Sequence, residues 1–308
     1  MDICTGLTNA KKFKKSNLTI GCFDGMHKGH IKIITELKRV SDNNHMPSVV
    51  VTFDPHPQSI LNNNLNDWAI LTTNEQKLEL FYEHGIDYTW IIPFSKDVAK
   101  ITAEQFLNEY LIKYFKPMEI VIGYDHHFGY KREGDSEFLN FMKGKYSYKI
   151  RKVDPFIVNN IIVSSTLIRN YIKRSKISSA NLLLDRKYSL RGEVVEGKGI
   201  GQDIGFPTAN IRPYNHNQLI PSRGVYCVDV IVNNNNYIGM CNIGTQPTLH
   251  NQGENVIEVH IITDSNLSIY GEEILVKFKD FIRKEKKYKN TTELVKQLHI
   301  DRYTCMPN

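Results

Sequence analysis

The sequence predicts two domains, an α/β domain with a parallel sheet over residues 1–185 and an antiparallel β domain with a terminal helix over residues 186–308. Two domains are the ordinary expectation for a chain of 308 residues. In the first part, short apolar strands alternate with amphipathic helices, which is typical of a parallel sheet with helices on both faces. In the second part, strand-like runs follow one another with only turns between them, which favours an antiparallel barrel or sandwich.

The strands expected in the first domain are short apolar runs, and they are Leu18–Gly21, Ser48–Phe53, Tyr88–Ile92, Glu119–Gly123 and Ile161–Val163. The helices expected between them are Ile31–Val40, Asn74–His84, Ala103–Phe115 and Ser136–Lys143. Ligands of parallel sheets bind beyond the carboxyl ends of the strands, so the polar segments at those ends are candidates for a site.

The strands expected in the second domain are Ser189–Val195, Gly224–Val232, Tyr237–Gly244, Val256–Thr263 and Ile274–Phe281. The asparagine cluster Asn233–Asn236 is expected to form a hairpin loop between two of them. A final helix is expected over Thr291–His299, with Thr291 or Thr292 as its N-cap.

Composition limits the classes of function. The formal net charge of +6 is spread over both domains and forms no aromatic-interleaved patch, so we expect anionic small substrates and no nucleic-acid partner. The five cysteines are odd in number and include no CxxC pair, which argues against a disulfide framework or a zinc–thiolate site. Met1–Asn17 lacks a signal-peptide pattern and no apolar run is long enough to span a membrane, so we expect a cytoplasmic protein without a membrane partner.

The segment Gly21–His30 joins the first expected strand to the first helix. His27 and His30 are three residues apart at the start of that helix, so they share one face. A helix N-terminus attracts anions through its free N–H groups and its dipole. The histidines therefore predict a phosphate site with donors that can follow charge developing in a transition state. A metal pair and a simple helix cap remain alternatives at this point, although no third metal ligand is nearby.

Four segments, in this order along the chain, resemble the nucleotidylyltransferase superfamily: Gly21–His30, Val51–Pro57, Ile122–Gly129 and Ser164–Arg169. More closely, they resemble the adenylyltransferase half of bacterial bifunctional riboflavin kinase/FAD synthetases. The resemblance implies a Rossmann-like fold and the transfer of an adenylyl group from ATP to FMN, which gives FAD and pyrophosphate. His126 departs from the family, which usually has Phe there. Asp54 and His56 either take part or only end a strand in a turn made rigid by prolines.

The resemblance also implies roles for single residues of the first domain. ATP contacts are implied for Gly21, Phe23, Asp24, Gly25, His27, Gly29, His30, Ser164, Thr166 and Arg169. Flavin contacts are implied for Asp125 and Phe128, and catalytic roles for His27, His30, Asp125 and Arg169.

A glycine-rich segment, Gly197–Asn210, is the densest signal in the second domain. Pro207 excludes the helix that a dinucleotide fingerprint needs, so the glycines predict a loop whose N–H groups wrap phosphates. Thr208 and Asn210 share a face of an extended chain, and their neutral oxygens suit Mg²⁺. In the run Val256–Ile261, alternation places Glu258 on the face opposite the apolar residues, where a carboxylate can orient an attacking hydroxyl.

This second domain resembles riboflavin kinases, on Gly197–Asn210 and on later segments in the same order. The later segments are Gly224–Tyr226, Asn242–Thr248, Glu258–His260, Tyr270–Glu272 and Phe281–Glu285. The resemblance implies a β-barrel that makes FMN and ADP from riboflavin and ATP, with Glu258 as catalytic base and Thr208 and Asn210 as Mg²⁺ ligands. ATP contacts are implied for Gly197, Lys198, Gly199, Gly205, Phe206, Pro207, Thr208 and Asn210, and flavin contacts for Glu258, Tyr270 and Arg283.

The sequence therefore predicts a bifunctional transferase whose substrates are riboflavin, FMN and ATP and whose metal is Mg²⁺. Gln202 stands where the kinase family usually has Arg. Two alternatives remain, an enzyme with one working site and a flavin- or nucleotide-binding regulator. The sequence leaves the oligomeric state open.

Overall fold

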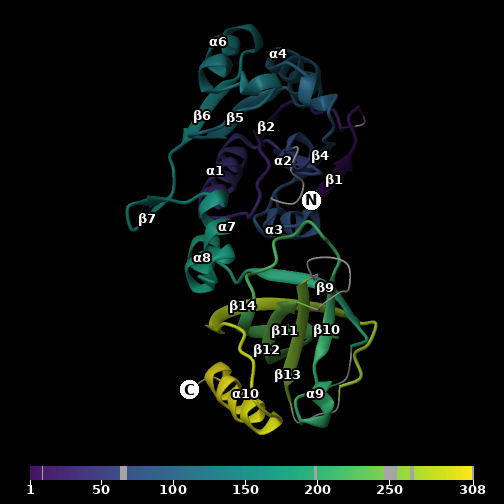
Figure 1. Ribbon diagram of the computed structural model, residues 1–308. Coiled ribbons are helices and arrows are strands. Elements are labelled where there is room, and N and C mark those ends of the chain that lie inside the picture. Colours follow the sequence, from purple (N-terminus) through teal and green to yellow (C-terminus); the bar gives the residue numbers. More distant parts are fainter. Residues whose placement is uncertain (9, 63–67, 198–199, 246–254, 264–266, 307–308) are drawn as a thin grey trace. The chain divides into compact units, whose positions relative to one another are not determined.

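The computed structural model describes the chain except residues 9, 63–67, 198–199, 246–254, 264–266 and 307–308 (Figure 1). Its contacts divide the chain into two compact units, Met1–Ser165 and Thr166–Asn308. Within the described residues, no helix is both long and apolar enough to cross a lipid bilayer.

The first unit is built on a parallel sheet, as the sequence predicts. Its strands are β1 (Asp2–Thr5), β2 (Ser16–Ile20), β3 (Ser48–Asp54), β4 (Tyr88–Pro93), β5 (Pro117–Gly123) and β6 (Lys149–Val153). Their order in the sheet is β1-β4-β3-β2-β5-β6, and each neighbouring pair is parallel. The chain adds β3 and β4 on one side of β2 and then β5 on the other side, so the strand order reverses between β2 and β5.

Helices cover both faces of this sheet. They are α1 (Lys28–Asn44), α2 (Pro57–Leu61), α3 (Asn74–Glu83), α6 (Ser136–Tyr146) and one continuous helical segment formed by α4 (Ala103–Gln105), the π-helical η3 (Phe106–Ile112) and α5 (Lys113–Phe115). Short 3₁₀ turns lie at η2 (Val98–Lys100) and η4 (Tyr130–Arg132).

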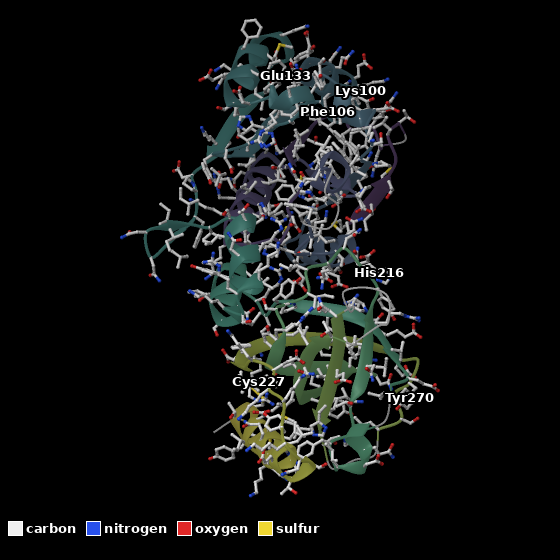
Figure 2. All side chains as sticks on the ribbon, in the orientation of Figure 1. Lys100, Phe106, Glu133, His216, Cys227 and Tyr270 are labelled. Carbon is white, nitrogen blue, oxygen red and sulfur yellow. A yellow bond between two sulfur atoms is a disulfide. The ribbon has the colours of Figure 1, made fainter. Side chains whose placement is uncertain are left out.

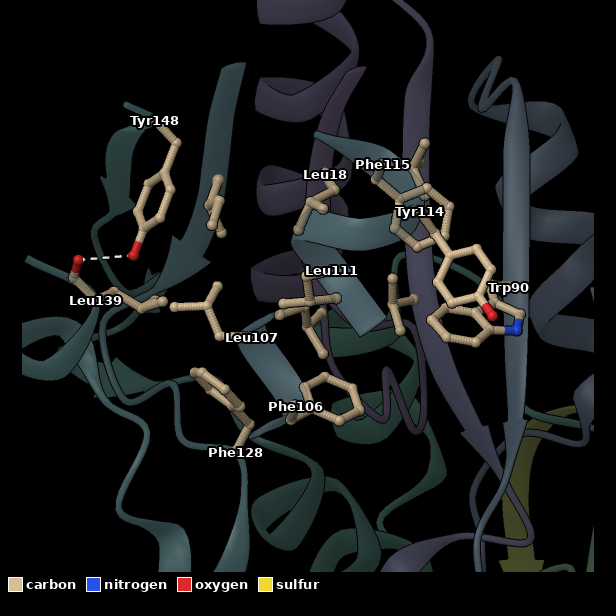
Figure 3. Close-up of a cluster of buried hydrophobic side chains, with 14 of the residues drawn as sticks. Leu18, Trp90, Phe106, Leu107, Leu111, Tyr114, Phe115, Phe128, Leu139 and Tyr148 are labelled. Carbon is tan, nitrogen blue, oxygen red and sulfur yellow. Dashed lines mark hydrogen bonds between the residues drawn. The ribbon is translucent and has the colours of Figure 1, made fainter. Parts of the chain in front are cut away.

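The apolar side chains of β3 alternate between the two faces, as a strand buried on both sides requires. Val49 and Val51 join a cluster with Leu107 and Phe115 of the η3–α5 segment, whereas Val50 joins α1 and α3 on the opposite face. Figure 3 shows the first of these clusters, in which the Tyr148 hydroxyl donates to the carbonyl oxygen of Leu139 at 2.8 Å.

The prediction for Ile161–Val163 is wrong about its place in the fold. Residues Ile161–Ile162 form β8, which pairs antiparallel with β7 (Ile157–Val158) in a separate two-stranded sheet. The strands that the prediction missed, β1 and β6, both lie at edges of the parallel sheet. An edge strand is half exposed and carries polar residues, as Lys149–Val153 does, so it lacks the apolar run that marks a central strand.

The second unit contains a closed antiparallel barrel, which confirms the predicted class and decides between barrel and sandwich. Its strands are β9 (Ser189–Val195), β10 (Ala209–Pro213), β11 (Gly224–Val232), β12 (Asn235–Thr245), β13 (Asn255–Ile262) and β14 (Glu273–Arg283). They close in the order β10-β13-β12-β11-β14-β9. Asn233 and Asn234 have positive φ angles of 51° and 61° and form the hairpin turn between β11 and β12, whereas Asn235 and Asn236 already belong to β12, so the loop is shorter than the predicted Asn233–Asn236.

The helices of the second unit correct two further predictions. They are α7 (Ser165–Lys173), whose first residue belongs to the first unit, α8 (Ile177–Leu184), α9 (Ile200–Asp203) and α10 (Thr291–Cys305). The short α9 separates β9 from β10, where only a glycine-rich loop was expected. The N-cap of α10 is Asn290, whose side chain accepts from the backbone N–H of Glu293 at 2.9 Å, rather than Thr291 or Thr292.

Helix α8 belongs to the same compact unit as the barrel. The Asn181 side chain donates to the carbonyl oxygen of Phe278 at 2.9 Å and accepts from the N–H of Tyr188 at 2.8 Å. These bonds join α8 to β14 and to the residue before β9. The functional boundary at residue 185 stays a prediction.

Cys227 and Cys305 form a disulfide, which the sequence analysis did not expect. The bond ties β11 to the C-terminal end of α10 across 78 residues of sequence, and Figure 2 marks Cys227. An odd cysteine count excludes pairing of all five residues, but it does not exclude one pair brought together by the fold. Cys4, Cys22 and Cys241 are not part of this disulfide.

Candidate active sites

The first candidate site lies where the strand order reverses, between the carboxyl ends of β2 and β5. In parallel α/β sheets this reversal opens a crevice in which ligands bind. The loop after β2 carries His27, and the loop after β5 carries Asp125. The fold thus brings to one edge of the sheet two segments that are about a hundred residues apart in sequence.

The two histidines of the first loop form a stacked pair. Their ring centroids are 3.7 Å apart with an interplanar angle of 16°. His27 is the N-cap of α1, and its Nδ1 accepts from the backbone N–H of His30 at 3.3 Å. His27 is buried and His30 is half-buried. A cap that accepts through Nδ1 leaves Nε2 of His27 to carry the proton, so this ring can donate to an anion.

The rest of this loop is held in place by the segment that contains Leu71 and Thr72. Asp24 is buried, and its Oδ1 accepts from the N–H groups of Leu71 and Thr72 at 2.8 and 3.1 Å. Gly25 has a φ of +85°, and a Cβ there would lie 2.8 Å from Leu71. The structure therefore gives Asp24 and Gly25 a clear role in shaping the loop, while their predicted contacts with ATP stay predictions.

Lys77 on α3 is a buried cation near the ends of β2 and β3. The sequence analysis did not identify this residue. Its Nζ donates to the carbonyl oxygens of Cys22 and Phe53, both at 3.5 Å, where β2 and β3 end. Burial lowers the pKa of Lys77. No motif marks this lysine, because its surroundings arise only when α3 packs on the sheet.

The loop after β5 presents Asp125 at the surface and buries Phe128. Phe128 packs on Phe106 and Phe138, with ring centroids 5.8 and 6.1 Å apart, and so belongs to the core. His126 packs on Phe128 at 5.7 Å, and burial lowers the pKa of His126 to about 4. The flavin contact predicted for Phe128 stays a prediction, since the ring is enclosed by its own unit.

Three further predicted residues of the adenylyltransferase site lie around the start of α7, namely Ser164, Thr166 and Arg169. Ser164 precedes the helix, and the hydroxyl of Ser165 donates to the carbonyl oxygen of Asp24 at 2.7 Å. Thr166 and Arg169 belong to the second unit, where Thr166 is exposed and Arg169 is buried. Their contacts with the triphosphate stay predictions.

The second candidate site is a pocket of about 410 Å³ between the outer face of the barrel and α10. Predicted residues that line it are Phe206, Thr208, Asn210, Glu258 and Arg283. Lining residues that sequence reasoning did not assign to a site include Met240, Asn242, His260, Tyr288, Leu294 and Leu298. These residues reach the pocket because of the strand register and the packing of α10, and a single sequence reveals neither.

Three polar side chains form a row across neighbouring strands in this pocket. Glu258 on β13 lies opposite Asn210 on β10 and opposite Asn242 on β12. Directly opposed residues have Cβ atoms about 5 Å apart. The predicted alternation of β13 is confirmed, because Ile257, Val259 and Ile261 are buried while Glu258 lines the pocket. The carboxylate is thus flanked on both sides by an amide.

His260 holds the loop that leads into β10. One ring nitrogen, Nδ1, lies 2.8 Å from the carbonyl oxygen of Pro207, and the ring packs on Phe206 at 5.1 Å. Burial lowers the pKa of His260 despite the opposing effect of the bond to Pro207. A neutral ring donates through Nδ1 to this carbonyl, so His260 fixes the backbone immediately before Thr208.

Other predicted kinase residues lie outside the pocket wall or outside the described residues. A Cβ on Gly197 would lie 1.8 Å from the Asn210 amide, so this close approach requires glycine. Gly205 and Pro207 are exposed. Tyr270 is 62% exposed, and Figure 2 marks it at the margin of the barrel. Lys198 and Gly199 lie outside the described residues.

Metal binding at either site would not rest on a cluster of strong ligands. Within the part of the chain that the structure describes, no group of three or more His, Cys, Asp or Glu residues is arranged to hold a metal ion. Among those described residues, no third ligand completes a zinc-type site at the histidine pair. The neutral oxygens of Thr208 and Asn210 instead suit a hard cation that also binds nucleotide phosphates.

A Rossmann-like unit with imidazoles at its switch point, together with a barrel pocket centred on a carboxylate, defines a two-domain transferase that uses nucleotides. The FAD synthetase family model matches residues 9–167, and the riboflavin kinase model matches residues 184–306. The chain therefore belongs to the bifunctional riboflavin kinase/FMN adenylyltransferase family. The predicted class of enzyme and the order of its two halves are confirmed.

Individual relatives agree over nearly the whole chain. The bifunctional riboflavin kinase/FMN adenylyltransferase of Listeria monocytogenes is 34% identical over 92% of this chain and 89% of the relative. The protein of that name from Escherichia coli is 32% identical over 99% and 97%. A solved structure described as a macrolide-efflux protein from Streptococcus pneumoniae has a TM-score of 0.88 at 29% identity and covers 98% of both chains.

Proposed function

We propose that the barrel pocket phosphorylates riboflavin and that the β2/β5 edge of the first unit contributes the site that adenylylates the resulting FMN. ATP is a substrate in both reactions. The observation that carries the proposal is the row of Asn210, Glu258 and Asn242, which sets one carboxylate between two amides in the pocket wall. Such a carboxylate can take a proton from a hydroxyl that attacks phosphorus.

In the kinase reaction, the ribityl 5′-hydroxyl oxygen of riboflavin forms a bond to the γ-phosphorus of ATP. The bond from that phosphorus to the β,γ-bridging oxygen breaks, and ADP leaves with the electron pair. Glu258 orients the hydroxyl and accepts its proton. The apolar wall formed by Met240, Leu294 and Leu298 suits the flat flavin ring and excludes water from it.

Enzymes that transfer phosphoryl groups from ATP use a divalent metal ion, and we propose Mg²⁺ for this chain. The residues present fit it, because Thr208 and Asn210 line the pocket with neutral oxygens and Gly197 allows the backbone to approach Asn210 closely. When bound, the ion neutralises charge on the nucleotide phosphates.

In the adenylyltransferase reaction, a phosphate oxygen of FMN forms a bond to the α-phosphorus of ATP. The bond between the α-phosphorus and the α,β-bridging oxygen breaks, and pyrophosphate leaves. His27 and His30 are proposed to donate to the phosphate oxygens, where negative charge gathers in the transition state. Asp125 is proposed to position the flavin nucleotide. Ser164, Thr166 and Arg169 are proposed to hold the triphosphate. Because both reactions consume ATP, we propose a cytoplasmic location.

A time course of flavin products tests this proposal. Purified protein is incubated with riboflavin, ATP and Mg²⁺, and riboflavin, FMN and FAD are separated by chromatography. We expect FMN to appear first and FAD after a lag that shortens when FMN is supplied. If riboflavin gave FMN but no FAD formed even from supplied FMN, the protein would have a single working site. If neither flavin gave a product, the protein would be a binding protein rather than an enzyme.

A further inference from the structure

We propose that Asp301, on the C-terminal helix α10, is a positioning residue that aims the guanidinium of Arg283 at riboflavin in the kinase pocket. The inference rests on the proposed function of that pocket. Arg283 ends β14 and lines the pocket, with 20% of its side chain exposed. Asp301 forms an ion pair with this guanidinium, and its side chain is fully buried.

The contact between the two residues fixes the plane of the guanidinium. Arg283 Nε lies 3.1 Å from both carboxylate oxygens of Asp301, and Nη2 lies 2.7 Å from Oδ2. The third nitrogen, Nη1, donates to the carbonyl oxygen of Lys284 at 3.2 Å. A planar guanidinium that is hydrogen-bonded at all three nitrogens has little freedom to rotate. Its remaining N–H groups therefore have a fixed orientation.

Asp301 is itself held in place. Gln297, one helical turn earlier on α10, donates through Nε2 to Asp301 Oδ1 at 2.9 Å. A buried carboxylate is tolerated only with such partners, so the pair forms as a unit when α10 packs on the barrel. The guanidinium is therefore positioned by the helix whose Leu294 and Leu298 form the apolar wall of the pocket.

The pairing also indicates what Arg283 recognises. Because a buried carboxylate offsets its charge, Arg283 reaches the pocket as an oriented donor rather than as a free cation. An oriented donor suits the uncharged polar atoms of riboflavin, whereas the triphosphate of ATP attracts cations that are not already paired. Loss of Asp301 should therefore affect riboflavin more than ATP.

The test uses the full chain and steady-state kinase kinetics with riboflavin and ATP varied in turn. For Asp301→Asn we expect KM for riboflavin to rise about tenfold, with kcat changed less than about twofold and KM for ATP unchanged. Asp301→Glu, which keeps the charge but moves the carboxylate by one methylene, should raise the same KM to a smaller extent. In an Arg283→Lys background, Asp301→Asn should add nothing further, since the guanidinium it positions is gone.

Cys305→Ser is the matched control, because it loosens α10 one turn beyond Asp301 without touching Arg283. If Cys305→Ser reproduces the change in KM, or if the Asp301 and Arg283 effects add, Asp301 only docks the helix and the proposal is wrong. An unchanged KM for riboflavin in a kinase-active Asp301→Asn or Asp301→Glu protein would also overturn it. Absence of kinase activity in the unsubstituted protein would instead refute the proposed function.

Discussion

Glu258 lies opposite Asn210 in the register of β13 and β10, and both side chains face the pocket outside the barrel. Asn242 lies opposite Glu258 on the other side, so two asparagines stand in equivalent positions around one carboxylate. Only Asn210 has Thr208 two residues away on the same face of its strand. The two amides should therefore differ in function although they are similar in geometry.

We expect Asn210→Ala to raise the Mg²⁺ concentration needed for half-maximal kinase activity by about tenfold or more, because one of two proposed oxygen ligands is lost. Asn242→Ala is the matched control and should leave that concentration unchanged. The measurement is kinase rate against Mg²⁺ at fixed ATP and riboflavin. Equal shifts in both variants would contradict the assignment of Thr208 and Asn210 to the metal.

His260→Phe removes the bond to Pro207 and keeps an aromatic ring against Phe206. A hydrogen bond of this kind contributes about 1 kcal/mol, so we expect kcat/KM for ATP to fall about fivefold to tenfold. His260→Gln, whose amide can donate to the same carbonyl, should recover part of the loss. If Gln and Phe behave alike, His260 serves packing rather than the position of the loop.

The lowered pKa of His126 makes stability of the first unit depend on pH. The folded pKa of about 4 lies below the ordinary 6.5, so the unfolded chain binds more protons between these values. Stability is therefore lost as pH falls from 6.5 towards 4, by roughly 3 kcal/mol at most. His126→Phe should remove this part of the acid sensitivity.

Tryptophan fluorescence measures this effect selectively, because both tryptophans, Trp68 and Trp90, lie in the first unit. Urea unfolding at pH 7 and pH 4.5 gives the pH dependence for the unsubstituted protein, for His126→Phe and for the exposed neighbour variant His127→Phe. Of the two substitutions, only His126→Phe should reduce the difference in the free energy of unfolding between the two pH values. If His127→Phe alone reduced the pH dependence of unfolding, the acid sensitivity would belong to His127, and the assignment to His126 would be wrong.

The central strands and the order of the motifs could be predicted from the sequence. Which strands pair, and which of their residues lie opposite one another, could not. Strands such as Ser48–Asp54 are buried on both faces and are therefore continuous apolar runs. The edge strand Lys149–Val153 and the five-residue β10 carry no such run. Glu258 was found by resemblance and alternation, but its place opposite Asn210 depends on register.

Contacts made by α10 were beyond prediction for a related reason. Asp301 and Cys305 are ordinary residues of a helix until the helix packs on the barrel. Their partners, Arg283 and Cys227, lie 18 and 78 residues earlier, and nothing in the local sequence links them. Lys77 is similar, since its carbonyl partners end two separate strands.

The most direct test of two separate sites is a reciprocal pair of substitutions assayed on both reactions. Glu258→Gln should lower FMN formation from riboflavin by about a hundredfold or more and leave FAD formation from supplied FMN unchanged. His30→Ala should do the reverse, stopping FAD formation while FMN accumulates at the normal rate. If either substitution removed both activities from a folded protein, the assignment of one reaction to each site would be contradicted.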